Sequence, residues 1–277
     1  MENVLENLKE NNFVFKKKFG QNFITDTNLL KAIVDDAKVC KNDEVLEIGT
    51  GAGTLTKELA KNASKVLTLE IDRTLKPILT ENFKDYDNIE LCFADFMMVG
   101  NQEVNNHFEM PFKVVANLPY YITTPIIFKL IKEKYNVYSI TIMVQKEVAE
   151  RLVAKHGTKE YGAISARLQA VADVNITRIV SKKMFTPMPS VDSAVVNIEL
   201  KRNKFDIKNI QVLDRVIEVA FSMRRKTLSN CLKSKLNFTQ EMVNEILTKM
   251  NLKLDIRGEA LSVEQFVELA NIISELK

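Results

Sequence analysis

The chain has 277 residues, a length that suits one large and one small domain. Hydrophobic residues make up 46% of it and charged residues 27%, which is ordinary for a folded protein and excludes the disordered and low-complexity classes. Lys and Arg number 39 against 36 Asp and Glu, so the total charge of +3 does not by itself identify a nucleic-acid-binding protein.

The rare residue types and the apolar runs exclude further classes. Three cysteines, Cys40, Cys92 and Cys231, fit neither a disulfide framework nor a zinc or iron–sulfur spacing. Because His107 and His156 are the only histidines, we expect no metal. No run of about 18 apolar residues occurs, and the chain starts with the acidic segment MENVLENLKE, so we expect no membrane span and no signal peptide. These features predict a cytoplasmic protein.

In chain order, a helical N-terminal extension over 1–44 is followed by alternating strand and helix patterns. The extension breaks at 19–23, and residues 25–27 offer N-cap candidates for the periodic stretch 29–39. The following short apolar runs predict strands of a mostly parallel sheet with helices on both faces, which is an α/β fold. Strands are predicted at 44–48, 65–71, 89–93, 113–116 and 139–144, with helices at 55–61, 75–83 and 125–135.

The pattern changes near residue 200. Helices at 147–155 and 162–171 and a strand at 194–200 are followed only by helical patterns, at 206–232, 239–251 and 262–276. We therefore divide the chain into a large α/β domain, 1–200, and a small all-α C-terminal domain, 201–277.

Positive charge is concentrated in one segment. Residues 181–235 contain 12 Lys and Arg against 5 Asp and Glu, a net charge of +7, so the rest of the chain sums to −4. Arg224, Arg225 and Lys226 form a basic run within this segment, and Lys16, Lys17 and Lys18 form a second one. Such clusters are typical of contacts with a phosphate backbone, so we predict RNA binding at both, although basic runs also occur as plain solvated surface.

Three successive strands end in residues that suit a nucleoside ligand. The first leads into Gly49-Thr50-Gly51-Ala52-Gly53, where missing Cβ atoms let a ligand approach the backbone. The second ends at Glu70, which can bind both ribose hydroxyls, and the third at Asp95, which can accept from an adenine amino group. The turn lacks the Gly-x-Gly-x-x-Gly spacing of dinucleotide sites. The pattern thus favours S-adenosylmethionine over a nicotinamide cofactor.

The fourth strand leads into Asn117-Leu118-Pro119-Tyr120. Pro119 has a fixed φ and keeps Leu118 extended, which directs the Asn117 amide and the backbone carbonyls outward. We expect the Asn117 oxygen and the Leu118 or Pro119 carbonyl to accept from an exocyclic amine whose ring stacks on Tyr120. These four residues are the predicted catalytic segment for a flipped base. A proline turn beside a buried tyrosine is the alternative.

Seven segments carry a resemblance that covers nearly the whole chain: 18–23 (KFGQNF), 47–53 (EIGTGAG), 117–120 (NLPY), 143–149 (MVQKEVA), 185–196 (FTPMPSVDSAVV), 221–228 (FSMRRKTL) and 257–259 (RGE). With them the sequence resembles the small-subunit ribosomal RNA adenine N6-dimethyltransferase family (KsgA/RsmA), which is related to the Erm methyltransferases of large-subunit rRNA. Ile24, Thr50 and Tyr121 depart from the family, where Leu, Pro and Asn are usual.

The resemblance implies a Rossmann-like, seven-stranded class I methyltransferase sheet with a small helical C-terminal domain. It implies that S-adenosylmethionine is bound by Asn22, Ile24, Gly49, Gly51, Glu70, Asp95 and Asn117. The implied reaction is dimethylation of N6 on two adjacent adenosines near the 3′ end of 16S rRNA in the immature small ribosomal subunit, as a step of ribosome biogenesis. We expect the enzyme to be a monomer.

Other functions remain open at this point. An Erm-like enzyme would methylate 23S rRNA, whereas a non-catalytic ribosome-assembly factor would bind the immature subunit without transferring methyl groups. A nicotinamide oxidoreductase is the remote alternative. The segments 185–196 and 257–259 favour the small subunit over the large one.

Overall fold

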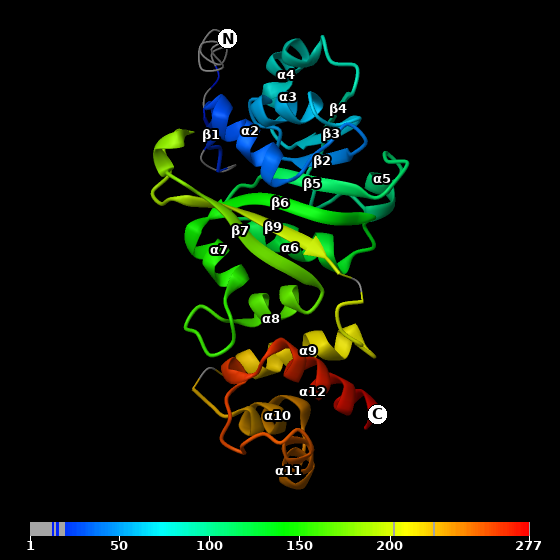
Figure 1. Ribbon diagram of the computed structural model, residues 1–277, viewed down its shortest axis with the longest axis vertical. Coiled ribbons are helices and arrows are strands. Elements are labelled where there is room, and N and C mark those ends of the chain that lie inside the picture. The colour runs from blue at the N-terminus through cyan, green and yellow to red at the C-terminus, as the bar shows by residue number, and fades with distance from the viewer. Residues whose placement is uncertain (1–12, 14, 17–19, 202, 224, 277) are drawn as a thin grey trace. The chain divides into compact units, whose positions relative to one another are not determined.

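A computed structural model describes residues 13, 15–16, 20–201, 203–223 and 225–276, and its main feature is a seven-stranded sheet in the order β4-β3-β2-β5-β6-β9-β7 (Figure 1). A separate two-stranded sheet pairs β1 with β8. The strands are β1 Phe23–Ile24, β2 Glu44–Ile48, β3 Lys65–Glu70, β4 Ile89–Phe93, β5 Phe112–Asn117, β6 Val137–Gln145, β7 Ala172–Val180, β8 Phe185–Thr186 and β9 Ser193–Leu200. The predicted α/β class with seven strands is confirmed.

The middle of the large sheet is parallel, as the apolar runs predict. Strand β2 pairs in parallel with β3 on one side and with β5 on the other, and every residue of β2 is buried. Strand β9 runs antiparallel to β6. The chain moves outward from β2 through β3 to β4 and then returns to β5 on the other side of β2. The boundary between β2 and β5 is therefore the topological switch point, where open α/β sheets bind ligands.

The helices cover both faces of this sheet. Leu30 of α2 and Leu59 of α3 share a core with Val45 and Val115 of the strands, so these two helices lie on one face. The β5-to-β6 connection runs in the opposite direction across the sheet, and right-handed crossovers then place α6 on the other face (Figure 1). The helices of this part are α2 Thr27–Asp36, α3 Thr54–Ala60, α4 Lys76–Phe83, α5 Asn101–Asn105 and α6 Thr123–Lys132. As predicted, Asp26 caps α2, accepting from the Leu29 N–H at 2.8 Å.

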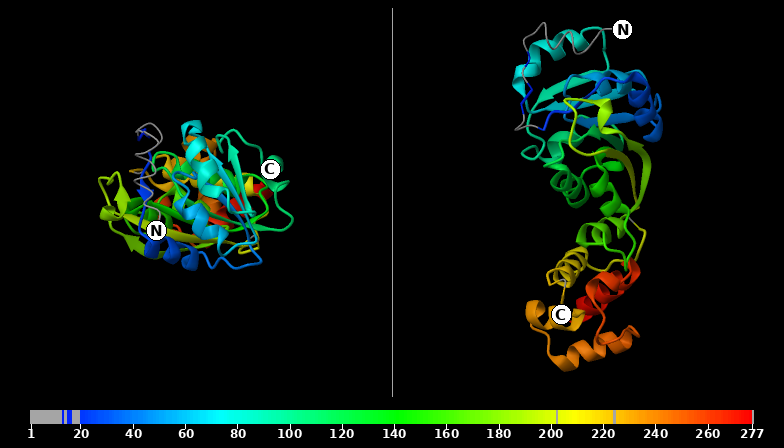
Figure 2. Two further views of the ribbon diagram at one scale, coloured as in Figure 1. Left: turned by 90° about the horizontal axis from the view of Figure 1, so that it is seen from above. Right: turned by 90° about the vertical axis from the view of Figure 1, so that its left-hand side faces the viewer.

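The remaining helices follow β6. They are α7 Lys146–Val153, α8 Ala163–Gln169, α9 Ile210–Phe221, α10 Leu228–Leu236, α11 Gln240–Lys249 and α12 Val263–Glu275, and α9 to α12 are drawn from yellow to red in Figure 2. Short 3₁₀ turns occur at Arg73–Leu75, Lys182–Met184 and Gly258–Ala260. In the part of the chain that the structure describes, no helix has the length and apolar character needed to cross a membrane.

One predicted helix is wrong, and one strand of the large sheet was missed. The helix predicted over 206–232 is two helices, α9 and α10. Residues 222–223 and 225–227 between them are not helical, and Thr227 accepts from the Asn230 N–H and caps α10. Strand β7 was missed because its buried and exposed residues alternate, as on a half-covered strand, whereas the predicted strands were found by continuous apolar runs.

The chain forms two compact units, 1–149 with 175–200, and 150–174 with 201–277. The second unit has its own core, in which Tyr161 and Ala166 pack with Leu213, Leu232 and Phe266. The predicted division at residue 200 coincides with one of these boundaries, but residues 150–174 group with the C-terminal helices. Their own sequence gives no sign of this, because a helical pattern does not reveal which core its apolar face joins.

Candidate functional site

A pocket opens at the switch point between β2 and β5, at the carboxyl ends of the parallel strands. Four segments that are distant in the sequence line it, namely the N-terminal segment, the glycine turn after β2, the end of β3 and the loop after β5. The lining residues are Gly20 to Ile24, Glu47, Gly49 to Ala52, Thr54, Leu55, Glu70, Ile71 and Asn117 to Tyr121. The structure thus brings together the predicted cofactor residues, with the exception of Asp95, and the four predicted base-binding residues.

The glycine turn fits closely against its neighbours. Gly51 has φ +56°, its N–H donates to Glu70 Oε2 at 2.8 Å, and a Cβ here would lie 3.1 Å from the Phe23 ring. Gly53 has φ +79°, and its Cβ would lie 2.7 Å from the Phe83 ring. Positive φ and these short approaches require glycine at both positions. The turn therefore places a bare backbone in the pocket, as the sequence predicts.

Glu70 is buried at the end of β3. Its Oε2 accepts from Gly51 N–H and its Oε1 accepts from Asp72 N–H at 2.7 Å, so two backbone donors fix its orientation. Burial raises the pKa of Glu70, while these hydrogen bonds oppose the shift. Each oxygen keeps a second lone pair, which suits a carboxylate that must accept from two ligand hydroxyls.

A buried chain of hydroxyl groups lies beneath the turn. The hydroxyls of Thr56 and Thr68 both donate to Glu47 Oε2, at 2.5 and 2.7 Å, and Thr50 Oγ1 lies 2.6 Å from Thr68 Oγ1. Because Thr68 uses its proton on Glu47, Thr50 is the donor to Thr68. Thr50, where the family usually has proline, thus ties the turn to the sheet. Burial raises the pKa of Glu47 to about 8.

Asn117 connects the end of β5 to the N-terminal segment. Its Nδ2 donates to the Asn22 carbonyl at 2.9 Å. This bond fixes which way the side-chain amide faces and directs Nδ2 to the N-terminal segment, so Oδ1 is the atom that the predicted base site would use as its acceptor. The Pro119 carbonyl, however, already accepts from Ile122 N–H and from the Thr123 hydroxyl. Of the two predicted backbone acceptors, the structure therefore favours Leu118.

Tyr120 is half-buried and its ring is held by a residue that the sequence patterns did not single out. Its hydroxyl lies 2.6 Å from Oγ of Ser193, the buried first residue of β9. Burial raises the pKa of Tyr120, so its hydroxyl stays protonated at neutral pH. Tyr121, by contrast, is 60% exposed.

Asp95 does not line the pocket. It lies in the turn after β4, half-buried, and its Oδ1 accepts from Met97 N–H at 2.9 Å. Its charge nevertheless acts at the rim, because burial, Asp95 and Glu70 together raise the pKa of Tyr121. The assignment of Asp95 to the cofactor remains a prediction.

Comparisons with known proteins agree with this geometry. The family model described as "Ribosomal RNA adenine dimethylase" matches residues 12–274. The chain belongs to this family.

Its relatives are similar over their whole length. A ribosomal RNA small subunit methyltransferase A from Clostridium acetobutylicum is 42% identical over 98% of both chains, and one from Bacillus cereus is 44% identical over 94% of this chain and 92% of the relative. The crystal structure of a dimethyladenosine transferase from Plasmodium falciparum has a TM-score of 0.80 and 27% identity over 91% of this chain and 98% of its own. The 23S rRNA methyltransferase ErmE, at 24% identity over 91% of this chain and 100% of its own with a TM-score of 0.71, shares the fold.

Family membership makes the chain an rRNA methyltransferase, and its predicted RNA contacts can now be placed. Lys17, Lys18 and Arg224 lie outside the described residues. Lys16 pairs with Asp72 at 2.7 Å, which gives it a role in the N-terminal segment itself. Arg225 and Lys226 are exposed, but on the turn between α9 and α10 and not on a helix as the sequence suggested.

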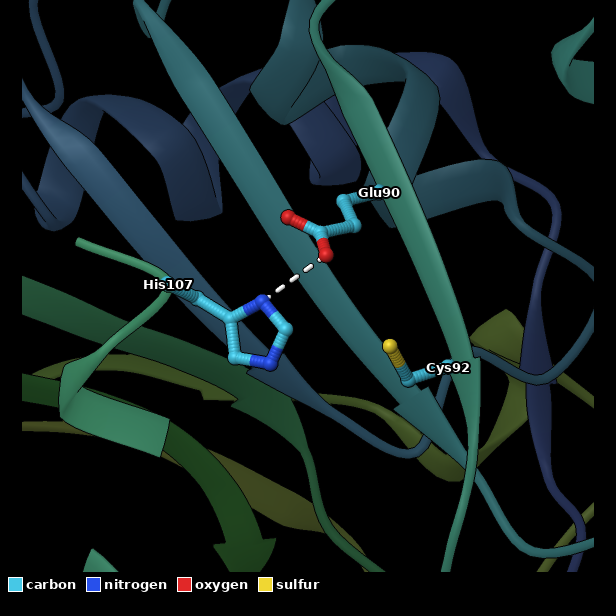
Figure 3. A group of neighbouring side chains, drawn as sticks. All are labelled: Glu90, Cys92 and His107. Atoms are coloured by element: carbon cyan, nitrogen blue, oxygen red, sulfur yellow. Dashed lines mark ion pairs between the residues drawn. The ribbon is translucent and has the colours of Figure 1, made fainter. Parts of the chain in front are cut away.

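The structure also gathers a group that the sequence did not predict, Glu90, Cys92 and His107, whose possible ligand atoms lie within 4.8 Å of one another (Figure 3). Glu90 Oε1 lies 2.8 Å from His107 Nδ1, and its Oε2 lies 3.1 Å from the ammonium of Lys65. Lys65 also donates to the His107 carbonyl. A metal would have to compete with this ammonium, so we interpret the group as an ion-pair cluster at the edge strand β4.

Proposed function

We propose that this chain transfers methyl groups from S-adenosylmethionine to N6 of two adjacent adenosines near the 3′ end of 16S rRNA, with the immature small ribosomal subunit as substrate. The observation that carries the proposal is that the nucleoside-type pocket and the Asn117–Tyr120 segment share one rim. The printed names of the relatives, small subunit methyltransferase and adenine dimethylase, support the choice of RNA and base.

The residues of the pocket fit S-adenosylmethionine. Gly49 has φ +85°, and a Cβ there would point into the mouth of the pocket, 3.9 Å from the Asn117 carbonyl and Pro119 Cδ. The turn is therefore a cradle that any side chain would fill. Glu70 would hold the ribose hydroxyls, and Asn22, Ile24 and the Gly49–Gly51 backbone would surround the rest.

The protein's contribution to the chemistry is position. When bound, S-adenosylmethionine supplies a methyl group on a sulfonium, which already contains its leaving group. Asn117 Oδ1 and the Leu118 carbonyl accept from the adenine amine, which orients its lone pair toward the donor. The amine proton becomes acidic only after transfer and passes to solvent, so no general base is required in this segment.

Tyr120 provides the face on which the base rests. Taking an adenine out of its stack costs a few kcal/mol, and stacking on an aromatic ring offsets about 1–3 kcal/mol of it. The contact with Ser193 holds the ring in one orientation before the base arrives. A preordered ring loses little entropy when the base binds.

The test is mass spectrometry of nucleosides from immature small subunits incubated with the purified protein and S-adenosylmethionine. We expect N6,N6-dimethyladenosine in 16S rRNA and none in 23S rRNA from large subunits treated in the same way. Dimethyladenosine in 23S rRNA alone would establish the Erm-like alternative. Binding to immature subunits without any methyl transfer would establish an assembly factor and overturn the enzyme.

A further inference from the structure

We propose that Asp72 is a positioning residue for the methyl donor, because it fastens the N-terminal segment that forms one wall of the pocket. The inference rests on the proposed function, since it assumes that S-adenosylmethionine occupies this pocket. Asp72 itself does not line the pocket, and it acts through Lys16 and Gln21.

Asp72 lies just beyond the end of β3 and is only 2% exposed. Its Oδ1 accepts from Lys16 Nζ at 2.7 Å and its Oδ2 accepts from Gln21 Nε2 at 2.9 Å. Gln21 Oε1 in turn accepts from Lys16 N–H at 2.8 Å, and Thr74 donates to Oδ1 from both its N–H and its hydroxyl. Asp72, Gln21 and Lys16, the last through both its ammonium and its backbone N–H, thus form a closed ring of hydrogen bonds that we call the clasp.

The clasp is next to both walls of the pocket. Gln21 immediately precedes Asn22, whose carbonyl accepts from Asn117. Two residues further on, the Ile24 carbonyl accepts from the Thr54 hydroxyl. On the other side, Asp72 N–H donates to Glu70 Oε1. Asp72 therefore connects the two walls: its buried carboxylate holds the segment that lines the pocket, and its backbone N–H holds the acid that would bind the ribose.

The charges suit this role. Burial alone would raise the pKa of Asp72, but the hydrogen bonds from Lys16 and Thr74 outweigh burial and hold its pKa below the ordinary value. Asp72 is therefore a carboxylate at neutral pH, and its bonds to an ammonium and an amide are of the strong, charge-assisted kind. Without them, the donor would have to order the segment as it binds, which lowers its apparent affinity.

The substitution Asp72→Asn tests the clasp with minimal change in shape. The Asn oxygen can keep the contacts of Oδ1, but its NH₂ group would face the NH₂ group of Gln21. Turning the Gln21 amide over would only move the conflict to Lys16 N–H. We expect the dissociation constant of S-adenosylmethionine, measured by calorimetry, to rise at least about tenfold, with its KM. At saturating donor, kcat should stay within about twofold.

A second substitution should rescue the first. In Asp72→Asn/Gln21→Glu, the Asn NH₂ donates to the new carboxylate. This carboxylate still accepts from Lys16 N–H and keeps a negative charge near the Lys16 ammonium. We expect most of the lost affinity to return. The matched control is Asp36→Asn, which removes a carboxylate that accepts from Arg178 elsewhere in the same unit, and whose donor affinity should equal that of the unsubstituted protein.

Two results would overturn the inference: unchanged donor affinity in Asp72→Asn, or a loss that Gln21→Glu does not reduce. If Asp72→Asn does not fold, Lys16→Met is judged by the same calorimetry, because it removes the ammonium from Asp72, keeps both bonds of Gln21 and changes no residue that lines the pocket. A rise in the dissociation constant would support the inference, and no rise would overturn it. Unsubstituted protein that binds no S-adenosylmethionine would instead overturn the proposed function.

Discussion

The pocket and the basic turn of the C-terminal unit are built in opposite ways. Around the pocket, polar groups are buried and satisfied: Glu70 accepts from two backbone N–H groups and Glu47 from two threonines. On the turn, Arg225 and Lys226 are exposed. A site that must orient one amine relative to one methyl group needs fixed groups, whereas a surface that attracts a long polyanion needs only mobile charge.

This difference implies different sensitivities to substitution. Removing one fixed group from the pocket leaves its partners buried and unsatisfied, so effects should be large and specific. Removing one cation from the turn takes away one of several weak, screened contacts. Substitutions in the two regions should therefore differ both in size and in their dependence on salt.

The largest effect is expected for Asn117→Ala. This change removes the acceptor for the adenine amine and the bond to the Asn22 carbonyl, so methyl transfer should fall by about 10²- to 10³-fold or more, to background. The rate of methyl incorporation into immature small subunits measures it. Asn197→Ala is the matched control, because it removes a similar amide that donates to Thr141 in the same sheet. Transfer at the normal rate by Asn117→Ala would contradict the base site.

Glu47→Gln should change stability in a pH-dependent way. The pKa of Glu47 is raised to about 8, so the folded state keeps a proton that the unfolded chain releases near pH 4.3. The folded state binds more protons between these two pKa values, so stability falls as pH rises from about 4 to 8 and then levels off. By pH 7 the loss amounts to about 3 kcal/mol.

Glutamine has no proton to lose, and its oxygen can accept from Thr56 and Thr68 as Glu47 Oε2 does. Urea unfolding should therefore show nearly equal free energies of unfolding at pH 4 and a variant that is more stable by about 3 kcal/mol at pH 7. Glu58→Gln, which breaks the pair with Lys61 in the same unit, should keep the original pH dependence. If the free energy of unfolding depends on pH in the same way for Glu47→Gln and the unsubstituted protein, Glu47 is ionised in the folded state.

Substitutions of Tyr120 should reduce methyl transfer less than Asn117→Ala does. Tyr120→Ala removes the stacking face. We expect it to weaken binding of the flipped base by about 1–3 kcal/mol, which lowers the rate of methyl transfer about 5- to 150-fold. Tyr120→Phe keeps the ring and loses only the contact with Ser193, so it should retain most of the activity. Tyr138→Ala serves as the control, because it removes an exposed tyrosine of the same sheet that donates to Asp43 and does not line the pocket, and it should leave methyl transfer unchanged. Equal losses in Tyr120→Phe and Tyr120→Ala would point to the hydroxyl and away from stacking.

The parts of the fold that the sequence predicted are those with local signals. Strand β2 was predicted with its observed bounds because an apolar run is bounded by charged residues and glycines. The break between α9 and α10 was missed, since no proline or glycine interrupts the helical pattern there. Strand β7 has an alternating pattern that only its place beside β9 explains.

In the candidate site, too, only residues with a local sequence signal could be predicted. Gly49, Glu70 and Asn117 could be predicted because each follows a recognisable strand, and parallel strands bring their ends together. The clasp of Asp72 with Lys16 and Gln21 joins residues more than 50 positions apart, and no periodicity reports such a contact. Lys16 was therefore interpreted as a basic surface residue, while the structure gives it a buried partner. Ser193 was missed for the same reason.

The smallest effect is expected at the basic turn. Some of the cations in 181–235 are already paired, as in Lys204 with Asp173 and Arg215 with Glu218, so we expect phosphate contacts at the exposed Arg225 and Lys226 instead. Replacing both with alanine should lower RNA affinity several-fold and reduce the slope of log affinity against log salt by about one per cation.

Binding of immature small subunits at several salt concentrations measures this slope, with Lys249→Ala/Lys253→Ala as a control that removes the same charge from exposed positions of the same unit. Because a phosphate contact releases counterions only where it forms, the control should leave the slope nearly unchanged. Equal reductions in both variants would mean that net charge, and not this turn, attracts the RNA. An unchanged slope for the turn variant would remove Arg225 and Lys226 from the RNA-binding surface, while the pocket and its chemistry would be unaffected.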